Sequence, residues 1–557
     1  MKRIRSLVTA LVVLVFIFSV FAGCGAKQGT EQNAGSAAEK TADVQTTETV
    51  GATEAAQEAE DSFKDTMALS VATWDIENDI ATQADDAVFQ AIAKKFNVTI
   101  KPIGLTWDDY GQKIQVWASS GQLPDIFSID AIGTQFYRNW IDQDVVKALP
   151  EDMGKYPNLA KYLESPDIKG LQEDGKFYCV PRKTYPSLDY NAVDRLVEYR
   201  WDLAQKAGVT KEPETWEEFK AMLKAIVQKD PEGKKIAGLT CVNVKQIGGF
   251  FWTYGNSAAT SDGSGTDYKW IKEDGQFIPA VFSKAALPAL QNMKDMYDQG
   301  LIDKDIALTK GDQGYDKFVS GKAAAVLHSG GYTTTTKKLY SDRWLKVNPD
   351  KSYSECIKAL KPLKGPDGVV SHAVFKTYWS ESYFNSKIED AKMDRIMALY
   401  DFLVSDEGRD LLRWGIKDVD YKVEGDNYTV VGDGAVTLAE KYKAMAVFKA
   451  LAEWDQGYAY NMNSPAIDKT IRKDAVDYMD WVIKNSKIPE FDIRLTYMST
   501  PAKDKFMVLD HDDMLKVLLS KDSAEKTWTD IVNGYKAKGL DTVISEVNAK
   551  AKEMGIN

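Results

Sequence analysis

The stretch ALSVATWDI at residues 68–76 decides the fold of this chain. Its small and β-branched residues predict a buried strand. Apolar residues at helical spacing follow between Val88 and Phe96, and residues 98–103 predict a second strand. A further helical stretch leads to a third short strand at residues 125–127. This order of strand, helix, strand, helix and strand indicates an α/β domain with a mostly parallel sheet.

A second region of the same kind begins near Pro181. There Thr215 and Glu218 have the spacing of a capping box, which marks the start of a helix. Trp216 and later apolar residues then fall on one face of that helix. About 495 residues follow position 62, which is more than one hydrophobic core usually holds, so we expect two or more domains.

The first 24 residues have the pattern of an export signal. A basic start precedes an apolar run at residues 7–21, which is shorter than the ~20 residues of a membrane-spanning helix. The run ends in Phe21-Ala22-Gly23-Cys24, which resembles the lipobox of bacterial lipoproteins, although Leu is more usual than Phe at its first position. We therefore expect residues 1–23 to be a signal peptide and Cys24 to carry a diacylglyceryl group. An ordinary secretory signal and an uncleaved anchor are the alternatives.

Residues 24–62 are expected to form a lipidated cysteine followed by a disordered tether. Beyond Cys24 this stretch consists mainly of Ala, Thr, Glu, Gln and Gly and has no aromatic residue, so it cannot bury enough surface to order itself. Anchor and tether together predict a folded body at the extracellular face of the cell membrane.

Charge and cysteine content restrict the classes of partner. The chain has a formal charge of −12, of which −9 falls on residues 63–557, and this argues against nucleic acid or anionic lipid as a ligand. The cysteines after Cys24 are Cys179, Cys241 and Cys356, which allow at most one disulfide and are expected to be structural thiols. Acidic residues around His511 suit the start of a helix better than a metal site.

Five motifs occur in the order in which one protein family has them. They are SSGQLPDI at residues 119–126, GKFYCVPR at 175–182, RWDL with PETWEEF within 200–219, FVSGKAA at 318–324, and DEG with VDYK within 406–422. From about Met67 to Asn557 the chain resembles the family 1 extracellular solute-binding proteins of ABC importers. Within them it is most similar to the large oligosaccharide-binding lipoproteins of Gram-positive bacteria.

The resemblance implies an α/β, two-lobed periplasmic-binding-protein-like fold, with a ligand cleft between lobes that crossover hinge strands join. We expect residues 63–182 plus about 331–410 to form the N-terminal lobe, and 183–330 plus about 411–557 to form the C-terminal lobe. Such a protein is a monomer and not an enzyme. It captures a solute, here expected to be an oligosaccharide, and delivers it to ABC permease subunits in the membrane.

A sugar ligand requires flat aromatic rings for its C–H faces and polar side chains for its hydroxyls. Candidate residues stand where predicted strands end, or where the chain should pass the cleft. They are Trp74, Asp75, Asp130, Arg182, Arg200, Trp252, Tyr254, Ser329, Tyr332, Tyr378, Trp379 and Trp454. Packing in a core is the alternative for each ring, and a structural ion pair is the alternative for each arginine.

No metal or other cofactor is expected. Large members of the family often carry a calcium loop, but the corresponding stretch DPEGKKIAGL at residues 230–239 has two acids followed by two lysines. Calcium needs six to eight oxygen ligands, which this stretch does not supply. Two alternative functions stay open: a surface sugar sensor for a membrane kinase, and a glycoside hydrolase, which would need two carboxylates flanking the scissile bond.

Overall fold

The computed structural model describes residues 63–556, except 107, 133, 262–264, 266–267, 329, 426, 433–436 and 453–467. The expected signal peptide, Cys24 and tether lie outside the described residues, as do Ser329 and Trp454. Within the described part, no helix is both long and apolar enough to cross a membrane.

The first of two main sheets has five strands in the order β2-β1-β3-β11-β4. Its strands are β1 (Met67–Ala72), β2 (Val98–Pro102), β3 (Ile126–Ile129), β4 (Cys179–Lys183) and β11 (Tyr378–Phe384). β1 pairs in parallel with β2 and β3, whereas β11 runs antiparallel between β3 and β4. The predicted mostly parallel sheet is therefore confirmed, with one antiparallel strand that comes from late in the chain.

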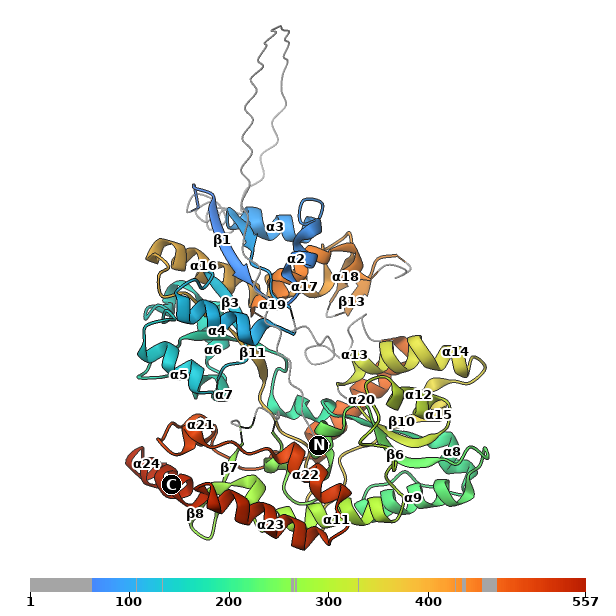
Figure 1. The fold of residues 1–557 in the computed structure, drawn as a ribbon. Coiled ribbons are helices and arrows are strands. Elements are labelled where there is room, and N and C mark those ends of the chain that lie inside the picture. Colours follow the sequence, from blue (N-terminus) through green and yellow to red (C-terminus); the bar gives the residue numbers. More distant parts are fainter. Residues whose placement is uncertain are drawn as a thin grey trace, which may run out of the picture. The chain divides into compact units, whose positions relative to one another are not determined.

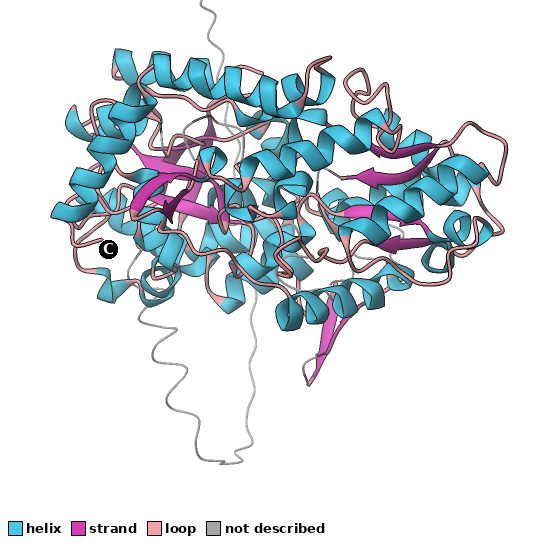
Figure 2. Cartoon of the chain, turned by 90° about the horizontal axis from the view of Figure 1, so that it is seen from below, coloured by secondary structure: helices cyan, strands magenta, loops and turns pink. Residues whose placement is uncertain are grey.

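Helices pack around this sheet (Figures 1 and 2). They are α2 (Ile76–Asp79), α3 (Ala87–Lys95), α4 (Tyr110–Ser120), α5 (Gln135–Asp142), α6 (Pro157–Leu163), α7 (Pro166–Lys169), α16 (Asp390–Leu403), α17 (Asp406–Trp414), α18 (Leu438–Lys441) and α19 (Ala446–Ala452). Short elements complete the set: η1 (Ile80–Thr82), η2 (Met153–Lys155), η9 (Lys443–Met445) and the hairpin of β12 (Tyr421–Glu424) with β13 (Asn427–Val430). α3 shows why such helices form here, because the Asp86 carboxylate caps its start by accepting the Phe89 N–H at 2.8 Å, while Val88 and Ile92 are fully buried.

The second sheet has four strands in the order β10-β5-β9-β6. They are β5 (Val197–Arg200), β6 (Ala237–Cys241), β9 (Ala323–Leu327) and β10 (Ile357–Ala359). β6 and β9 are parallel. β5 pairs antiparallel with β9, and β10 pairs antiparallel with β5 at the edge of the sheet.

Helices also pack around the second sheet. They are α8 (Trp201–Lys206), α9 (Trp216–Lys229), α10 (Gly248–Phe251), α11 (Ala286–Asp298), α12 (Gln313–Val319), α13 (Tyr332–Thr334), the π-helix η8 (Thr335–Trp344), α14 (Leu345–Val347), α15 (Tyr353–Cys356), α20 (Lys469–Asn485), α21 (Ile493–Tyr497), α22 (Asp510–Leu519), α23 (Ala524–Ala537) and α24 (Leu540–Glu553). Short elements are η4 (Val244–Gln246), η5 (Trp252–Tyr254), η6 (Ser257–Ala259), η7 (Ala280–Phe282), η10 (Lys503–Lys505) and the hairpin of β7 (Trp270–Glu273) with β8 (Gln276–Pro279). The predicted capping box of Thr215 and Glu218 is confirmed at the start of α9. The acidic stretch around His511 starts α22, as expected.

Two described crossover segments join the sheets. In each sheet they attach at the edge where the parallel strands end. Residues 184–196, with η3 (Leu188–Val193), run from the end of β4 to the start of β5, and residues 360–377 run from the end of β10 to the start of β11. The carboxyl ends of the parallel strands therefore face the crossovers in both sheets. We call residues 63–183 with 378–452 the first lobe, and residues 197–359 with 468–556 the second lobe.

These lobes differ from the expected boundaries in two places. Residues 331–359 pack in the second lobe, because β10 pairs with β5 and Trp344 is buried beside Tyr353. Residues 411–452 pack in the first lobe, where Leu412 and Phe448 belong to the core around the five-stranded sheet. The motifs indicate where the chain crosses, but they do not indicate to which sheet the following helices return.

Candidate functional site

Trp74, Arg182 and Trp379 form a stack at the carboxyl edge of the first sheet. The guanidinium carbon of Arg182 lies 4.7 Å from the ring centroid of Trp74 and 5.3 Å from that of Trp379. The two indole rings are 5.3 Å apart and tilted by 30°. The chain brings them together because Trp74 follows β1, Arg182 lies in β4 and Trp379 lies in β11. Trp379 is partly exposed, so its ring can stack on an apolar ligand face.

Arg182 is held by the protein around it. Its Nη2 donates to the Ser380 hydroxyl at 2.6 Å, and its Nη1 donates to the Ala450 carbonyl oxygen at 3.1 Å. The side chain is only 1% exposed, and this burial lowers the pKa of the guanidinium to about 9. Arg182 therefore fixes the positions of the two rings rather than extending into solvent.

A group of charged side chains lies beside this stack. Lys376 Nζ donates to Asp130 Oδ1 at 3.1 Å, and Glu381 is fully buried in β11. Glu381 Oε2 accepts the Ala131 N–H at 3.0 Å and the Tyr383 hydroxyl at 3.0 Å, whereas Oε1 has no hydrogen-bond partner among the described residues. Burial, assisted by the charge of Asp130, raises the pKa of Glu381 to about 7. The site thus combines aromatic faces, a cation, an anion and a titratable carboxyl.

The structure gathers six of the sequence-predicted residues at this edge. They are Trp74, Asp75, Asp130, Arg182, Tyr378 and Trp379. Asp75 adopts a left-handed conformation (φ 58°) where the chain turns from β1 into α2, which is why the predicted strand at residues 68–76 ends at Ala72. Tyr378 is buried, and its hydroxyl donates to the Tyr497 hydroxyl of α21 at 2.9 Å, so it joins the two lobes.

Sequence reasoning missed three residues of this site. Tyr110 packs edge-on against Trp74 at 5.4 Å, and Lys376 and Glu381 supply its charges. The last two stand within three positions of the aromatic pair Tyr378-Trp379, so their place beside a predicted crossover was the available signal.

Four other candidates lie elsewhere, in the second lobe. Arg200 is 1% exposed and forms a two-point ion pair with Asp202, both contacts at 2.8 Å, so it has the structural role that was its alternative. Trp252 is 0% exposed, and Tyr254 packs edge-on against Trp216 at 5.5 Å. Tyr332 is buried with its ring 5.9 Å from that of Tyr478. For Trp252 and Tyr332 these positions correct the expectation that the ring faces a ligand, because η5 and α13 turn both rings into the core, whereas Tyr254 is half-buried and packs against that core.

The loop at residues 230–239 uses its carboxylates internally. Asp230 accepts the backbone N–H groups of Lys234 and Lys235 at 3.0 and 2.9 Å. Glu232 pairs with Lys234 at 2.7 Å and with Lys206 at 3.2 Å. Elsewhere in the described residues, no group of three or more His, Cys, Asp or Glu side chains is placed to hold a metal ion.

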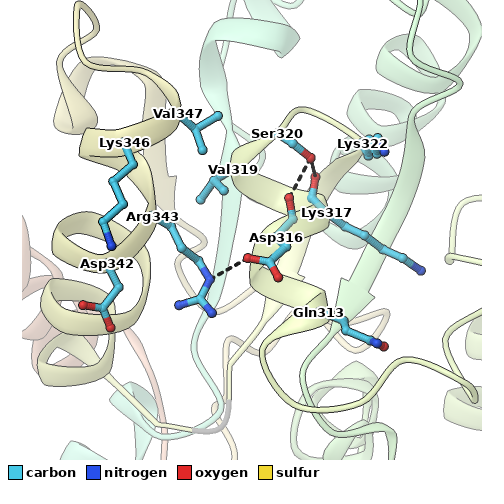
Figure 3. Close-up of a pocket in the computed structure, with 10 residues that line it drawn as sticks. All are labelled: Gln313, Asp316, Lys317, Val319, Ser320, Lys322, Asp342, Arg343, Lys346 and Val347. Atoms are coloured by element: carbon cyan, nitrogen blue, oxygen red, sulfur yellow. Dashed lines mark hydrogen bonds and ion pairs between the residues drawn. The ribbon is translucent and has the colours of Figure 1, made fainter.

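Among the described residues of the second lobe, two large surface pockets lie at opposite edges of the sheet. One, of about 720 Å³, is lined by residues 242–245 directly after β6, by 307, 309–312 and 315, and by 334, 337 and 338. It therefore lies at the edge that faces the crossovers. The other, of about 670 Å³, is lined by α12, η8, α14 and the residues before β9 (Figure 3), with Arg343 donating to Asp316 at 2.8 Å across it. Since β9 starts at that edge, this second pocket lies away from the crossovers.

Comparisons with known proteins agree with this architecture. The sequence model of the family described as bacterial extracellular solute-binding protein matches residues 87–407. The lipoprotein LipO of Bacillus subtilis (strain 168) is 22% identical over 466 residues, which cover 81% of this chain and 86% of LipO. The polygalacturonan/rhamnogalacturonan-binding protein YtcQ of the same strain is 24% identical over 390 residues, which cover 68% of this chain and 72% of YtcQ.

Solved structures show the same fold. The alginate-binding protein AlgQ2, crystallised without calcium ion, has a TM-score of 0.64 at 16% identity over 88% of this chain and 98% of AlgQ2. The substrate-binding protein FusA of the ABC transporter of S. pneumoniae, in complex with kestose, has a TM-score of 0.63 at 17% identity over 88% of this chain and 99% of FusA. The family match, the two sheets and the paired crossovers together show that this chain belongs to the bacterial extracellular solute-binding protein family.

Proposed function

We propose that this protein captures an oligosaccharide outside the cell and delivers it to an ABC importer. The observation that carries the proposal is the Trp74–Arg182–Trp379 stack beside Asp130 and Lys376, at the sheet edge that faces the crossovers. Aromatic faces flanked by fixed polar groups suit a sugar, whose rings are apolar on their faces and polar at their rims. The names of two relatives support it: YtcQ is named a polygalacturonan/rhamnogalacturonan-binding protein, and FusA, 25% identical over 207 residues, is named a fructooligosaccharide ABC transporter substrate-binding protein.

Reversible capture requires no nucleophile or general acid from the chain. A ligand that contacts both lobes favours the closed arrangement, because only closure allows both sets of contacts. An affinity in the micromolar range corresponds to about −8 kcal/mol, which is tight enough for capture and weak enough for release. On this proposal the protein acts as a monomer without catalysis, and its partners are ABC permease subunits in the membrane.

Anchoring at the cell surface is part of the proposal. The lipobox at Cys24 and the acidic stretch that follows support a diacylglyceryl anchor with a tether, and the relative LipO is named a lipoprotein. Anchoring would keep loaded receptor at high effective concentration near the permease. Replacing Cys24 by Ser should release the protein into the culture medium and abolish incorporation of labelled palmitate; retention of label would contradict lipidation at this residue.

The test uses residues 63–557 and a panel of neutral and acidic oligosaccharides. We expect isothermal titration calorimetry to detect at least one sugar ligand, and Trp379→Ala to weaken its binding while the melting temperature stays nearly unchanged. Incubation of protein with that ligand should leave it intact by chromatography. Cleavage at catalytic rates would instead support the glycoside hydrolase alternative, and absence of binding across the panel would reject a sugar ligand.

A further inference from the structure

The 720 Å³ pocket of the second lobe occupies the position that corresponds to the aromatic stack of the first lobe. Its wall includes residues 242–245, which leave the carboxyl end of β6, and Thr334 in α13, the helix that follows the neighbouring strand β9. In open α/β sheets, ligands bind beyond the carboxyl ends of the strands. The pocket is therefore placed to contact the same ligand from the opposite lobe.

The charged residues that line this pocket are mostly cations. The lysines are Lys245, Lys310, Lys337 and Lys338, and the only carboxylate among its lining residues is Asp312. The surrounding body is acidic, with a formal charge of −9 over residues 63–557. A concentration of four lysines in one hollow of an acidic protein creates a local positive potential.

Two of the four lysines, Lys338 and Lys245, are paired with carboxylates within the protein. Asp312 forms ion pairs with Arg343 at 2.8 Å and with Lys338 at 3.3 Å. Burial raises the pKa of Asp312, but the hydrogen bonds from these two cations outweigh that effect and lower it. Lys245 lies 3.9 Å from Asp512. Among the residues that the structure places, neither Lys310 nor Lys337 forms an ion pair, and both are exposed.

One interaction indicates that this pocket faces the first lobe. Hydrogen bonds from Thr437 lower the pKa of Glu440 in α18, and the charge of Lys337 lowers it further. Lys337 belongs to the second lobe, whereas α18 packs with the first. Lys337 therefore lies near enough to the first lobe for its charge to act there.

We propose that Lys310 and Lys337 bind a carboxylate of the ligand, so that the captured sugar is an acidic oligosaccharide built from uronic acid units. This deepens the proposed function and rests on it. Lysine ammonium groups are donors without acceptor capacity, and they attract a carboxylate far more strongly than a neutral hydroxyl. Asn243 and Thr334 line the same pocket and offer polar groups to the sugar hydroxyls, whereas the Thr309 hydroxyl is already bonded to Asp305 and Lys317.

The test compares acidic trisaccharides with neutral partners of the same size. Trigalacturonate, trimannuronate and triguluronate are titrated into residues 63–557 by calorimetry, together with the methyl esters of each and with neutral trisaccharides. At least one acid should bind more than tenfold tighter than its ester. Raising the salt concentration should weaken binding of the acid but not binding of the ester. The variant Lys310→Gln/Lys337→Gln should weaken binding of that acid by about tenfold.

A matched control separates the pocket from the net charge of the protein. Lys229→Gln removes an exposed lysine at the end of α9, which leads into the start of β6 and so lies at the opposite edge of the sheet. This variant should bind the acid like the unmodified protein. Equal affinity for acid and ester, or an unchanged affinity in the double variant, would overturn the inference. Binding of a neutral trisaccharide without any acid would also overturn it but leave the proposed function standing, whereas no binding of any sugar would reject both.

Discussion

Replacement of Trp252 by Ala should destabilise the second lobe without acting directly on ligand contacts. The indole is 0% exposed and packs in the core that includes α11 and the following helices. A buried aromatic side chain removes 150–250 Å² from water, and at ~25 cal/mol/Å² this amounts to ~4–6 kcal/mol. Trp→Ala substitutions in cores cost about 3–5 kcal/mol, so we expect a loss of about 4 kcal/mol in the free energy of unfolding. For a lobe of roughly 250 residues this corresponds to a fall of about 10 °C in melting temperature.

The assay is urea unfolding at constant temperature, followed by far-ultraviolet circular dichroism, in parallel with sugar titration. Trp379→Ala is the matched control, because it removes a partly exposed indole from the stack of the first lobe. Trp252→Ala should shift the unfolding midpoint and bind sugar normally at temperatures where it is folded. Trp379→Ala should keep the original unfolding midpoint and bind sugar more weakly. If Trp252→Ala kept the original midpoint and lost sugar affinity, its placement in the core would be refuted.

Three further predictions concern pH, metal and thiols. The pKa of Glu381 is raised to about 7 from 4.5, so between these pH values the folded state keeps a proton that the unfolded state loses. The free energy of unfolding should therefore fall by up to about 3 kcal/mol as the pH rises from 4.5 through 7. Glu381→Gln should reduce this pH dependence in urea titrations, and an identical pH dependence in the variant would contradict the raised pKa. Excess EDTA should leave the melting temperature unchanged, since the loop at residues 230–239 satisfies its own carboxylates; a loss that calcium restores would contradict this. Cys179 and Cys241 are free, buried and have raised pKa values because of that burial, so a thiol reagent should label them only as fast as the protein unfolds; rapid labelling of either in the native protein would be inconsistent with their burial.

Much of the first lobe could be predicted from residues close together in the sequence. The alternation of short apolar strands with helical stripes predicted β1, β2 and β3, and in the second lobe the capping box predicted the start of α9. The position of β11 could not be obtained in this way, because nothing in Tyr378–Phe384 itself states that it pairs between β3 and β4. The observed lobe boundaries differ from the predicted ones for the same reason. Strands that pair across hundreds of residues leave no periodic pattern in the sequence.

The residues of the candidate site also fall into those that the sequence could predict and those that it could not. Residues at strand ends, such as Trp74 and Asp130, could be predicted because strand ends of a parallel sheet meet at one edge. Trp252 and Tyr332 could not be assigned, because an aromatic residue after glycines is compatible with a ligand cleft and with a core. Glu381 was missed since its importance comes from burial beside Asp130, which is a property of the assembled sheet.

The insertion of β11 between β3 and β4 has a consequence for how the chain is made and exported. β4 ends at Lys183, yet the strand that pairs with it among the described residues begins at Tyr378, after all four strands of the second sheet in the sequence. The first lobe therefore cannot complete its sheet while the chain is emerging in order, and contacts of such high sequence separation form slowly. A chain that stays open until late in its synthesis suits export in an unfolded state, and a secreted fragment that stops before β11 should lack a stable first lobe altogether.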